Sequence, residues 1–124
     1  MYDVKGFHLL DKVIESVKVI QQRTETIHCV NDFLDTATGT LLLDGACMKL
    51  IATGESIKNL DKLTAGDLLA RYTQIPWREV MGMRDIIVYH YFEVDADVIF
   101  NTVKEEIPFL LEVLMQIRKD LNEK

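Results

Sequence analysis

The chain has 124 residues, of which 48 % are hydrophobic and 27 % charged, and it carries a formal net charge of −6 at pH 7. This size and apolar content exclude a disordered chain and favour one domain, spanning residues 1–124, with one hydrophobic core. The acidic balance argues against a broad nucleic-acid-binding surface, because such surfaces neutralise phosphates, and it leaves room for a basic protein partner.

The first half of the chain predicts two long helices. The first spans residues 7–23, because apolar residues recur there at helical spacing. Its apolar stripe comprises Leu10, Val13, Val17 and Ile20. A polar connector over residues 24–40 follows, with one short helical turn at 31–35, and a second long helix spans residues 41–60. That helix contains small residues that would allow a neighbouring helix to approach closely: Gly45, Ala46, Ala52 and Gly54.

The next segment predicts a third long helix after a loop. Residues 61–74 form a loop with a short helix, and Pro76 suits the first turn of the helix that starts at Trp77. The β-branched and aromatic run that follows has low helix propensity, so this helix should end near residues 90–92. Asp95 then begins the following helix as its N-cap.

The final helix is expected over residues 96–121. Its apolar residues alternate steps of three and four, which is typical of helix-on-helix packing. They are Val103, Ile107, Leu110, Leu114, Ile117 and Leu121. Pro108 removes a backbone donor within this helix and should bend it. The pattern as a whole predicts an all-α fold, an up-down bundle of four long helices with additional short ones.

The cysteines and two of the histidines carry no recognisable site. Cys29 and Cys47 are too few for a disulfide framework and lack metal-ligand spacing, so each is expected to be a small buried hydrophobe. His8 and His28 have no acidic or cysteine neighbour at ligand spacing and are expected at the surface. We therefore expect neither a metal nor a cofactor. No apolar run reaches the roughly 20 residues that a membrane span needs, and residues 1–6 do not resemble a signal peptide, so a cytoplasmic location is expected.

Residues 75–97 hold the densest cluster of chemically capable side chains. Arg84 is expected on the third helix, and His90 follows near its end. A histidine can act as base or acid near neutral pH, and an arginine offers a permanent charge and a forked set of donors that matches phosphate oxygens. These two residue types suffice in principle for metal-independent RNA cleavage through attack of the 2′-hydroxyl.

This stretch resembles the motif of the HEPN superfamily, in particular its HepT-like toxin branch. That motif is an arginine followed four to six residues later by a histidine, in this branch often Arg-x4-His-x-Tyr. Here five residues separate Arg84 from His90, so Tyr89 occupies the usual histidine position and Tyr91 keeps the position of the family's tyrosine. Further segments appear in the family's order: an amphipathic first helix, then D-F-L, I-A-T-G-E-S-I, I-P-W-R-E-V-M-G-M-R-D and E-E-I-P-F-L-L.

The resemblance implies a function and a set of partners. It implies a ribonuclease toxin of a type VII-like toxin–antitoxin pair, with Arg84 and His90 as the catalytic residues. It also implies a homodimer whose two motif helices line one cleft that holds the RNA substrate. The expected protein partner is an MNT-type nucleotidyltransferase antitoxin, which silences the toxin by transferring AMP onto Tyr91, placing bulk and negative charge beside Arg84.

Other residues are candidates for accessory roles. Asp85 lies next to the arginine, Tyr89 is a second candidate for modification, and Glu55 belongs to a Gly-Glu pair that the family shares. Glu55 is expected either at a helix interface or simply in solvent.

Helical geometry bears on two of the functional hypotheses, and a helical scaffold with no nucleotide chemistry is a third. On a continuous helix His90 lies about 120° from Arg84, since each residue advances about 100°, so one helix does not bring the two side chains together. A dimer could pool them. Alternatively, Arg84 pairs with Asp85 or Glu93 at the surface, His90 caps the helix end, and the protein is a non-catalytic binding partner of a nucleotidyltransferase.

Overall fold

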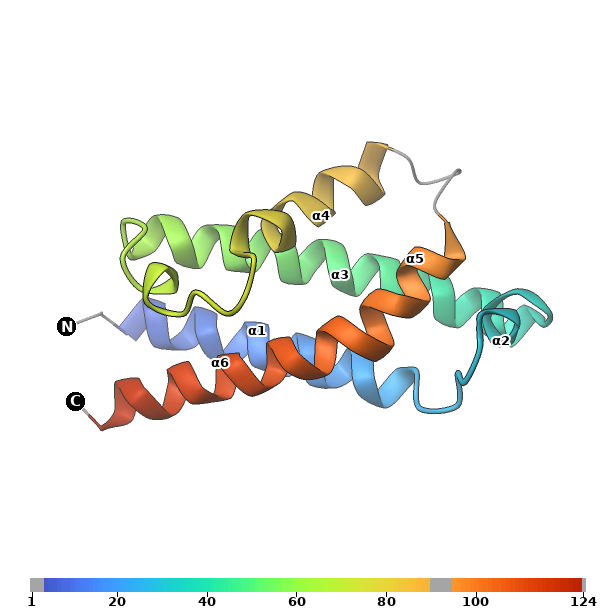
Figure 1. The fold of residues 1–124 in the computed structure, drawn as a ribbon, viewed down its shortest axis with the longest axis horizontal. Helices are drawn as coiled ribbons and strands as arrows, with labels where there is room; N and C mark the ends of the chain where they lie inside the picture. Colours follow the sequence, from blue (N-terminus) through green and yellow to red (C-terminus); the bar gives the residue numbers. More distant parts are fainter. Residues whose placement is uncertain (1–3, 90–94, 124) are drawn as a thin grey trace.

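The computed structural model of the chain describes residues 4–89 and 95–123, and within these ranges it contains helices and no strand (Figure 1). The helices are α1 Val4–Arg23, α2 Val30–Leu34, α3 Ala37–Leu63, η1 Leu69–Arg71, α4 Trp77–Tyr89, α5 Ala96–Asn101, η3 Thr102–Glu106 and α6 Ile107–Asn122. The prediction of an all-α fold is confirmed. None of the described helices is long and apolar enough to cross a lipid bilayer.

The long helices run alternately in opposite directions (Figure 1). α1 and α3 are antiparallel neighbours, α4 returns along α3, and the continuous α5–η3–α6 segment runs back beside α1. Both ends of the described chain therefore lie at the same end of the bundle. This is the predicted up-down arrangement of four long helices, in which short connections make consecutive helices antiparallel neighbours.

The core is built from the apolar stripes that the sequence predicts. On α1 the four stripe residues Leu10, Val13, Val17 and Ile20 are at most 1 % exposed. On the last helix Leu114 and Ile117 are fully buried, and Leu121 is partly buried. Burying such stripes removes apolar surface from water, and this is the main force that holds the bundle together.

Two long helices begin earlier than predicted. α1 starts at Val4, three residues before the predicted start at Phe7, and α3 starts at Ala37, four before the predicted start at Leu41. For α3 the reason is a local cap: the Thr36 hydroxyl accepts a hydrogen bond from the Gly39 amide at 2.9 Å. Such a cap satisfies a donor of the first turn, so the connector is shorter than expected.

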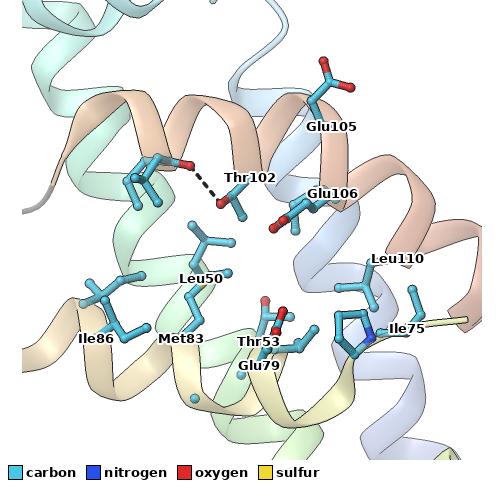
Figure 2. Close-up of a pocket in the computed structure, with 18 of the residues that line it drawn as sticks. Leu50, Thr53, Ile75, Glu79, Met83, Ile86, Thr102, Glu105, Glu106 and Leu110 are labelled. Atoms are coloured by element: carbon cyan, nitrogen blue, oxygen red, sulfur yellow. Dashed lines mark hydrogen bonds between the residues drawn. The ribbon is translucent and has the colours of Figure 1, made fainter. Parts of the chain in front are cut away.

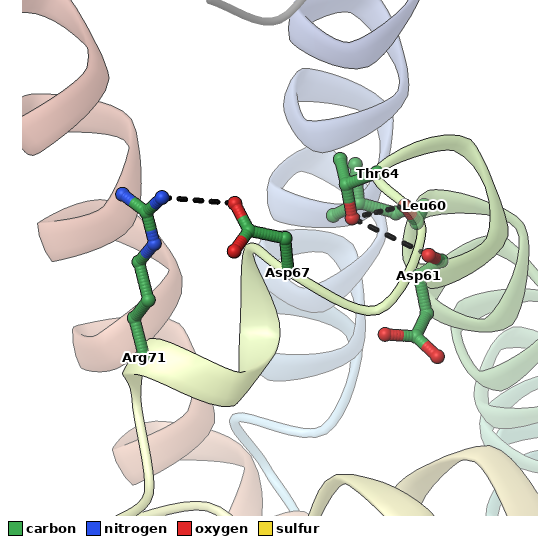
Figure 3. Close-up of polar contacts among 5 residues, drawn as sticks. All are labelled: Leu60, Asp61, Thr64, Asp67 and Arg71. Carbon is green, nitrogen blue, oxygen red and sulfur yellow. Dashed lines mark hydrogen bonds and ion pairs between the residues drawn. The ribbon is translucent and has the colours of Figure 1, made fainter.

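The turn after α3 is closed by backbone geometry and side-chain hydrogen bonds (Figure 3). Ala65 and Gly66 both have positive φ, at 55° and 73°, which ends the helix in the left-handed conformation. The Thr64 hydroxyl donates to carbonyls of the last helical turn. Arg71 pairs with Asp67 at 2.8 Å and spans the short helix η1.

The helix around Pro108 contains a π-helical turn, whereas the sequence predicted only a bend. The five residues before α6, Thr102–Glu106, form a π-helical turn, so the last helix is divided into α5, η3 and α6. Pro108 has no amide hydrogen to donate to the carbonyl four residues earlier, and the wider turn accommodates this missing bond. At the other end, Asp95 caps α5 as predicted, accepting a hydrogen bond from the Asp97 amide at 2.8 Å.

Two smaller predictions are corrected. Cys29 is exposed rather than buried, because it is the N-cap residue of the short helix α2. Cys47 is buried as expected, and its burial, with Asp44 nearby, raises the pKa of the thiol to about 11. Gly45 contacts no neighbouring helix, since a β-carbon there would meet nothing within 4 Å. His8 and His28 are exposed, as predicted.

Replacing Gly39 with alanine should severely destabilise the fold. A β-carbon there would overlap the Asp32 carbonyl oxygen and lie 3.0 Å from the Phe33 carbonyl oxygen, both backbone atoms of α2. We expect the free energy of unfolding to fall by about 3 kcal/mol. The matched control is Gly45→Ala on the same helix, which should gain about 1 kcal/mol from helix propensity. Urea denaturation of both variants measures this, and equal stabilities would contradict the packing.

Candidate active site on helix α4

The start of α4 is fixed by its first residues. Pro76 precedes the helix, and its carbonyl accepts the Val80 amide at 3.1 Å, so the proline lies where its missing N–H costs nothing. Trp77 is 9 % exposed, and its indole N–H donates to the Tyr72 carbonyl at 2.8 Å. These contacts anchor the N-terminal end of α4 to the loop before it, so the direction of the helix is set before Arg84.

The middle of α4 lies against α3 at a glycine. A β-carbon on Gly54 would lie 3.1 Å from the Val80 carbonyl oxygen and 3.6 Å from the Arg84 β-carbon. Any larger residue would crowd the backbone of α4, so the glycine permits a close approach of the two helices. This confirms the predicted packing role of Gly54, and it brings the base of the Arg84 side chain directly against α3.

Arg84 is held between two carboxylates. Its Nη1 donates to Asp85 Oδ1 at 2.7 Å, and its Nε lies 3.3 Å from Glu55 Oε2 on α3. The hydrogen bond with Asp85 and the negative charge of Glu55 raise the pKa of Arg84 above its ordinary value. Nη2 has no hydrogen-bond partner among the described residues. The side chain is 38 % exposed, so that a ligand in solvent can reach the remaining donors.

This arrangement can orient a cation but does not create a strongly positive surface. One guanidinium faces two carboxylates, so the local charge is negative, and a phosphate must use the donors that the carboxylates leave. The benefit is geometric: a long, flexible side chain fixed by two partners loses less conformational entropy when it binds a ligand. The site therefore presents a positioned arginine rather than a basic patch.

The structure brings three of the predicted site residues together and leaves others apart or outside the described ranges. Arg84, Asp85 and Glu55 form one cluster, whereas Tyr89 is 76 % exposed at the end of α4. His90 and Tyr91 lie outside the described residues, as does the predicted end of the helix near residues 90–92. Within residues 4–89 and 95–123, no group of three or more His, Cys, Asp or Glu side chains is arranged to hold a metal ion.

The pairing of Glu55 with Arg84 is the feature that sequence reasoning did not predict. The pairing of Arg84 with Asp85, by contrast, was one of the two interpretations left open. Glu55 is 29 residues from Arg84 in the chain, and neither residue shows its partner locally. The available signal is the glycine before Glu55, because a close helix approach at Gly54 places the next residue at the edge of the same interface.

Comparison with known proteins identifies the family. The family model described as "Ribonuclease HepT-like" matches residues 13–117, which includes all four long helices in whole or in part. The chain therefore belongs to the HepT-like ribonuclease family of the HEPN superfamily. No solved structure gives a significant match.

Curated relatives agree with this assignment. The chain is 33 % identical over 120 residues to a Methanocaldococcus jannaschii protein named "Gamma-glutamylcyclotransferase and putative RNase", covering 97 % of this chain and 50 % of that relative. It is 35 % identical over 111 residues to "Probable ribonuclease HepT" of Thermococcus cleftensis, covering 89 % and 93 %. A third relative, a "Putative RNase" of M. jannaschii, is 38 % identical over 78 residues, covering 63 % and 62 %. This chain thus spans half the length of the first relative.

Close packing at Gly54, rather than the ion pairs of Arg84, should hold α4 in place. We expect Gly54→Ala to lower the free energy of unfolding by about 1–2 kcal/mol, because a backbone oxygen must move. Arg84→Gln should leave the urea midpoint close to that of the wild type, since exposed ion pairs contribute little. Denaturation curves for the two variants test this. A larger loss for Arg84→Gln than for Gly54→Ala would show that the ion pairs are the main attachment.

Proposed function

We propose that this protein is a ribonuclease that acts as a homodimer in the cytoplasm and cleaves RNA without a metal or another cofactor. Membership in the HepT-like ribonuclease family carries the proposal. The position of Arg84 supports it: the guanidinium is held on α4 by Asp85 and Glu55 and remains open to solvent. Arg84 and His90 are the proposed catalytic residues, and Glu55 and Asp85 position the arginine.

The proposed reaction is transesterification within the RNA strand. His90 accepts the proton of a ribose 2′-hydroxyl, and the 2′-oxygen forms a bond to the adjacent phosphorus. The bond from phosphorus to the 5′-oxygen breaks, and that oxygen takes up a proton from the protonated histidine of the second copy. Arg84 stabilises the additional negative charge on the phosphate oxygens in the transition state. The products are a 2′,3′-cyclic phosphate and a 5′-hydroxyl.

A dimer is proposed because Arg84 and His90 of one copy would point in different directions from one continuous helix. α4 is helical through Tyr89, so a helix that continued one residue further would place His90 about 120° from Arg84. Two copies related by a two-fold axis present the same helix twice, and each phosphate-binding arginine can then meet the histidine of the other copy.

The proposed regulation uses a nucleotidyltransferase antitoxin. An MNT-type enzyme would transfer AMP to Tyr91, seven residues after Arg84, a spacing that on a continuous helix returns to nearly the same face. The added phosphate would compete for the guanidinium that otherwise binds RNA. This makes the protein the toxin of a toxin–antitoxin pair.

A second candidate function follows from the acidic cluster. Arg84 already faces two carboxylates, and the histidine stands one position later than in the usual family motif. A chain with these features could be the non-catalytic partner of a nucleotidyltransferase. It would form a stable complex with the transferase and cleave no RNA.

Arg84→Ala and His90→Ala should each abolish RNA cleavage by the purified protein. The first removes the charge that stabilises the transition state, and the second removes the base. Cleavage of a labelled single-stranded RNA is measured in the presence of EDTA, with detection of the 2′,3′-cyclic phosphate end. Rates should fall by at least about a hundredfold.

The matched control is Arg71→Ala, which removes another exposed arginine paired with a carboxylate at 2.8 Å. It should retain wild-type activity. Full activity in both the Arg84 and His90 variants would reject the catalytic assignment. A wild-type protein that cleaves no RNA but co-purifies with the transferase would favour the non-catalytic alternative.

Tyr91→Phe should block adenylylation, whereas Tyr89→Phe should not. The phenolic oxygen is the group that accepts AMP, and the phenylalanine lacks it. Each variant is incubated with ATP and the cognate transferase, and intact mass spectrometry detects the addition of one AMP group. Loss of the mass increase in the Tyr89 variant alone would move the modification to that residue.

A further inference from the structure

A long groove separates α4 from the α5–η3–α6 segment, with α3 as its floor (Figure 2). Its volume is about 780 Å³. From α4 the walls include Val80, Met83, Ile86 and Ile87, and from the opposite segment Val98, Ile99, Phe109 and Leu110. Arg84 is not one of the lining residues, so the groove is distinct from the proposed catalytic cluster.

The walls of this groove are apolar, and three of their side chains are exposed. α4 packs mainly against α3, and Ile86 is 62 % exposed. On the other side, Val98 and Phe109 are 56 % and 44 % exposed. Contiguous exposed apolar side chains on facing helices are typical of a binding groove, because burying them from water is favourable.

The two threonine hydroxyls that line the groove, one on α3 and one on η3, are not free to orient a small molecule. The Thr53 hydroxyl donates to the Lys49 carbonyl at 2.7 Å and lies 2.8 Å from the Ser16 hydroxyl. The Thr102 hydroxyl donates to the Val98 carbonyl at 2.9 Å (Figure 2). Small-molecule sites usually combine apolar walls with convergent polar groups, and here both threonine hydroxyls are already bonded within the protein.

Carboxylates surround the groove, and no lysine or arginine lines it among residues 4–89 and 95–123. Glu79 on α4 and Glu106 before α6 both point into the open space from opposite sides, whereas Glu105 points away from it (Figure 2). The carboxylates of these three glutamates have no hydrogen-bond or ion-pair partner among the described residues. Asp95 adds a fourth carboxylate at the end of the groove, where it caps α5.

The charges around the groove indicate which kind of molecule binds there. RNA is a polyanion and would be repelled by the two inward carboxylates. A second copy that docked groove to groove would bring these glutamates against the same glutamates, which disfavours association through this surface. A partner with an apolar face bordered by positive charges satisfies both the walls and the glutamates.

We propose that the groove between α4 and α5–α6 binds an amphipathic helix of a partner protein, with an apolar face flanked by lysine or arginine. Apolar side chains of that helix at positions i, i+3, i+4 and i+7 bury the groove walls. Its cations pair with Glu79 and Glu106. The lining extends from Pro76, just before α4, to Ile87 on α4. This is about three helical turns, so a helix of about 14 residues fills the groove.

The test uses two synthetic peptides of about 14 residues with the same leucine face and opposite flanks, one set of lysines and one of glutamates. Fluorescence anisotropy of the labelled peptides measures their binding to the full chain. The lysine peptide should bind, and added NaCl should weaken it, because exposed charges are screened. The glutamate peptide should bind at least about tenfold more weakly.

Charge variants locate the site. Glu79→Lys and Glu106→Lys should each weaken the lysine peptide by at least about tenfold, and the corresponding glutamine variants by less. The control is Glu112→Lys on α6, an exposed glutamate outside the groove, which should bind like the wild type. Circular dichroism confirms that all variants are folded.

Several outcomes would overturn the proposal. They are no binding of either peptide, equal binding of both, or an equal loss in the Glu112 variant. Analytical ultracentrifugation provides a further outcome that would overturn it. If the wild-type chain is a dimer and Phe109→Asp makes it monomeric, a second copy occupies the groove. A dimer that persists in this variant agrees with both the groove proposal and the proposed nuclease dimer. None of these results depends on ribonuclease activity.

Discussion

The close contact between α3 and α4 at Gly54 is the constraint on which the proposed functional surface depends. α4 packs mainly against α3, and the absence of a side chain at Gly54 allows its backbone to approach the Val80 carbonyl. Glu55, the next residue, then reaches Arg84. Gly54 also lines the groove that separates α4 from α5 and α6. One small residue thus positions both the arginine and the groove.

The two surfaces, the Arg84 cluster and the groove, differ in their charged groups. At Arg84 two carboxylates hold a guanidinium that still has N–H donors available. An anionic ligand can therefore form hydrogen bonds with these oriented donors although the local charge is negative. In the groove Glu79 and Glu106 face the open space, and no described lysine or arginine lines it. An acidic chain with a net charge of −6 therefore has one surface suited to a phosphate and another suited to a basic helix.

The local features of the fold follow from the sequence because they arise from neighbouring residues. The stripes on α1 and α6 depend on helical periodicity, and both are buried as predicted. Asp95 caps α5 because its side chain needs only the amide two residues later. The errors are also local in origin: Thr36 caps α3 earlier than expected, and Pro108 follows a π-helical turn that hydrophobic spacing alone does not reveal.

The sequence by itself determined the all-α class, the buried faces of the long helices, the place of Arg84 on α4 and the resemblance to the HepT-like family. Periodicity and short motifs carry that information within single helices. Only the tertiary structure decided that Glu55 is the partner of Arg84, that Gly54 rather than Gly45 is a packing contact, and that a groove lies beside α4. These features depend on how helices distant in sequence pack together, and no local spacing encodes that geometry.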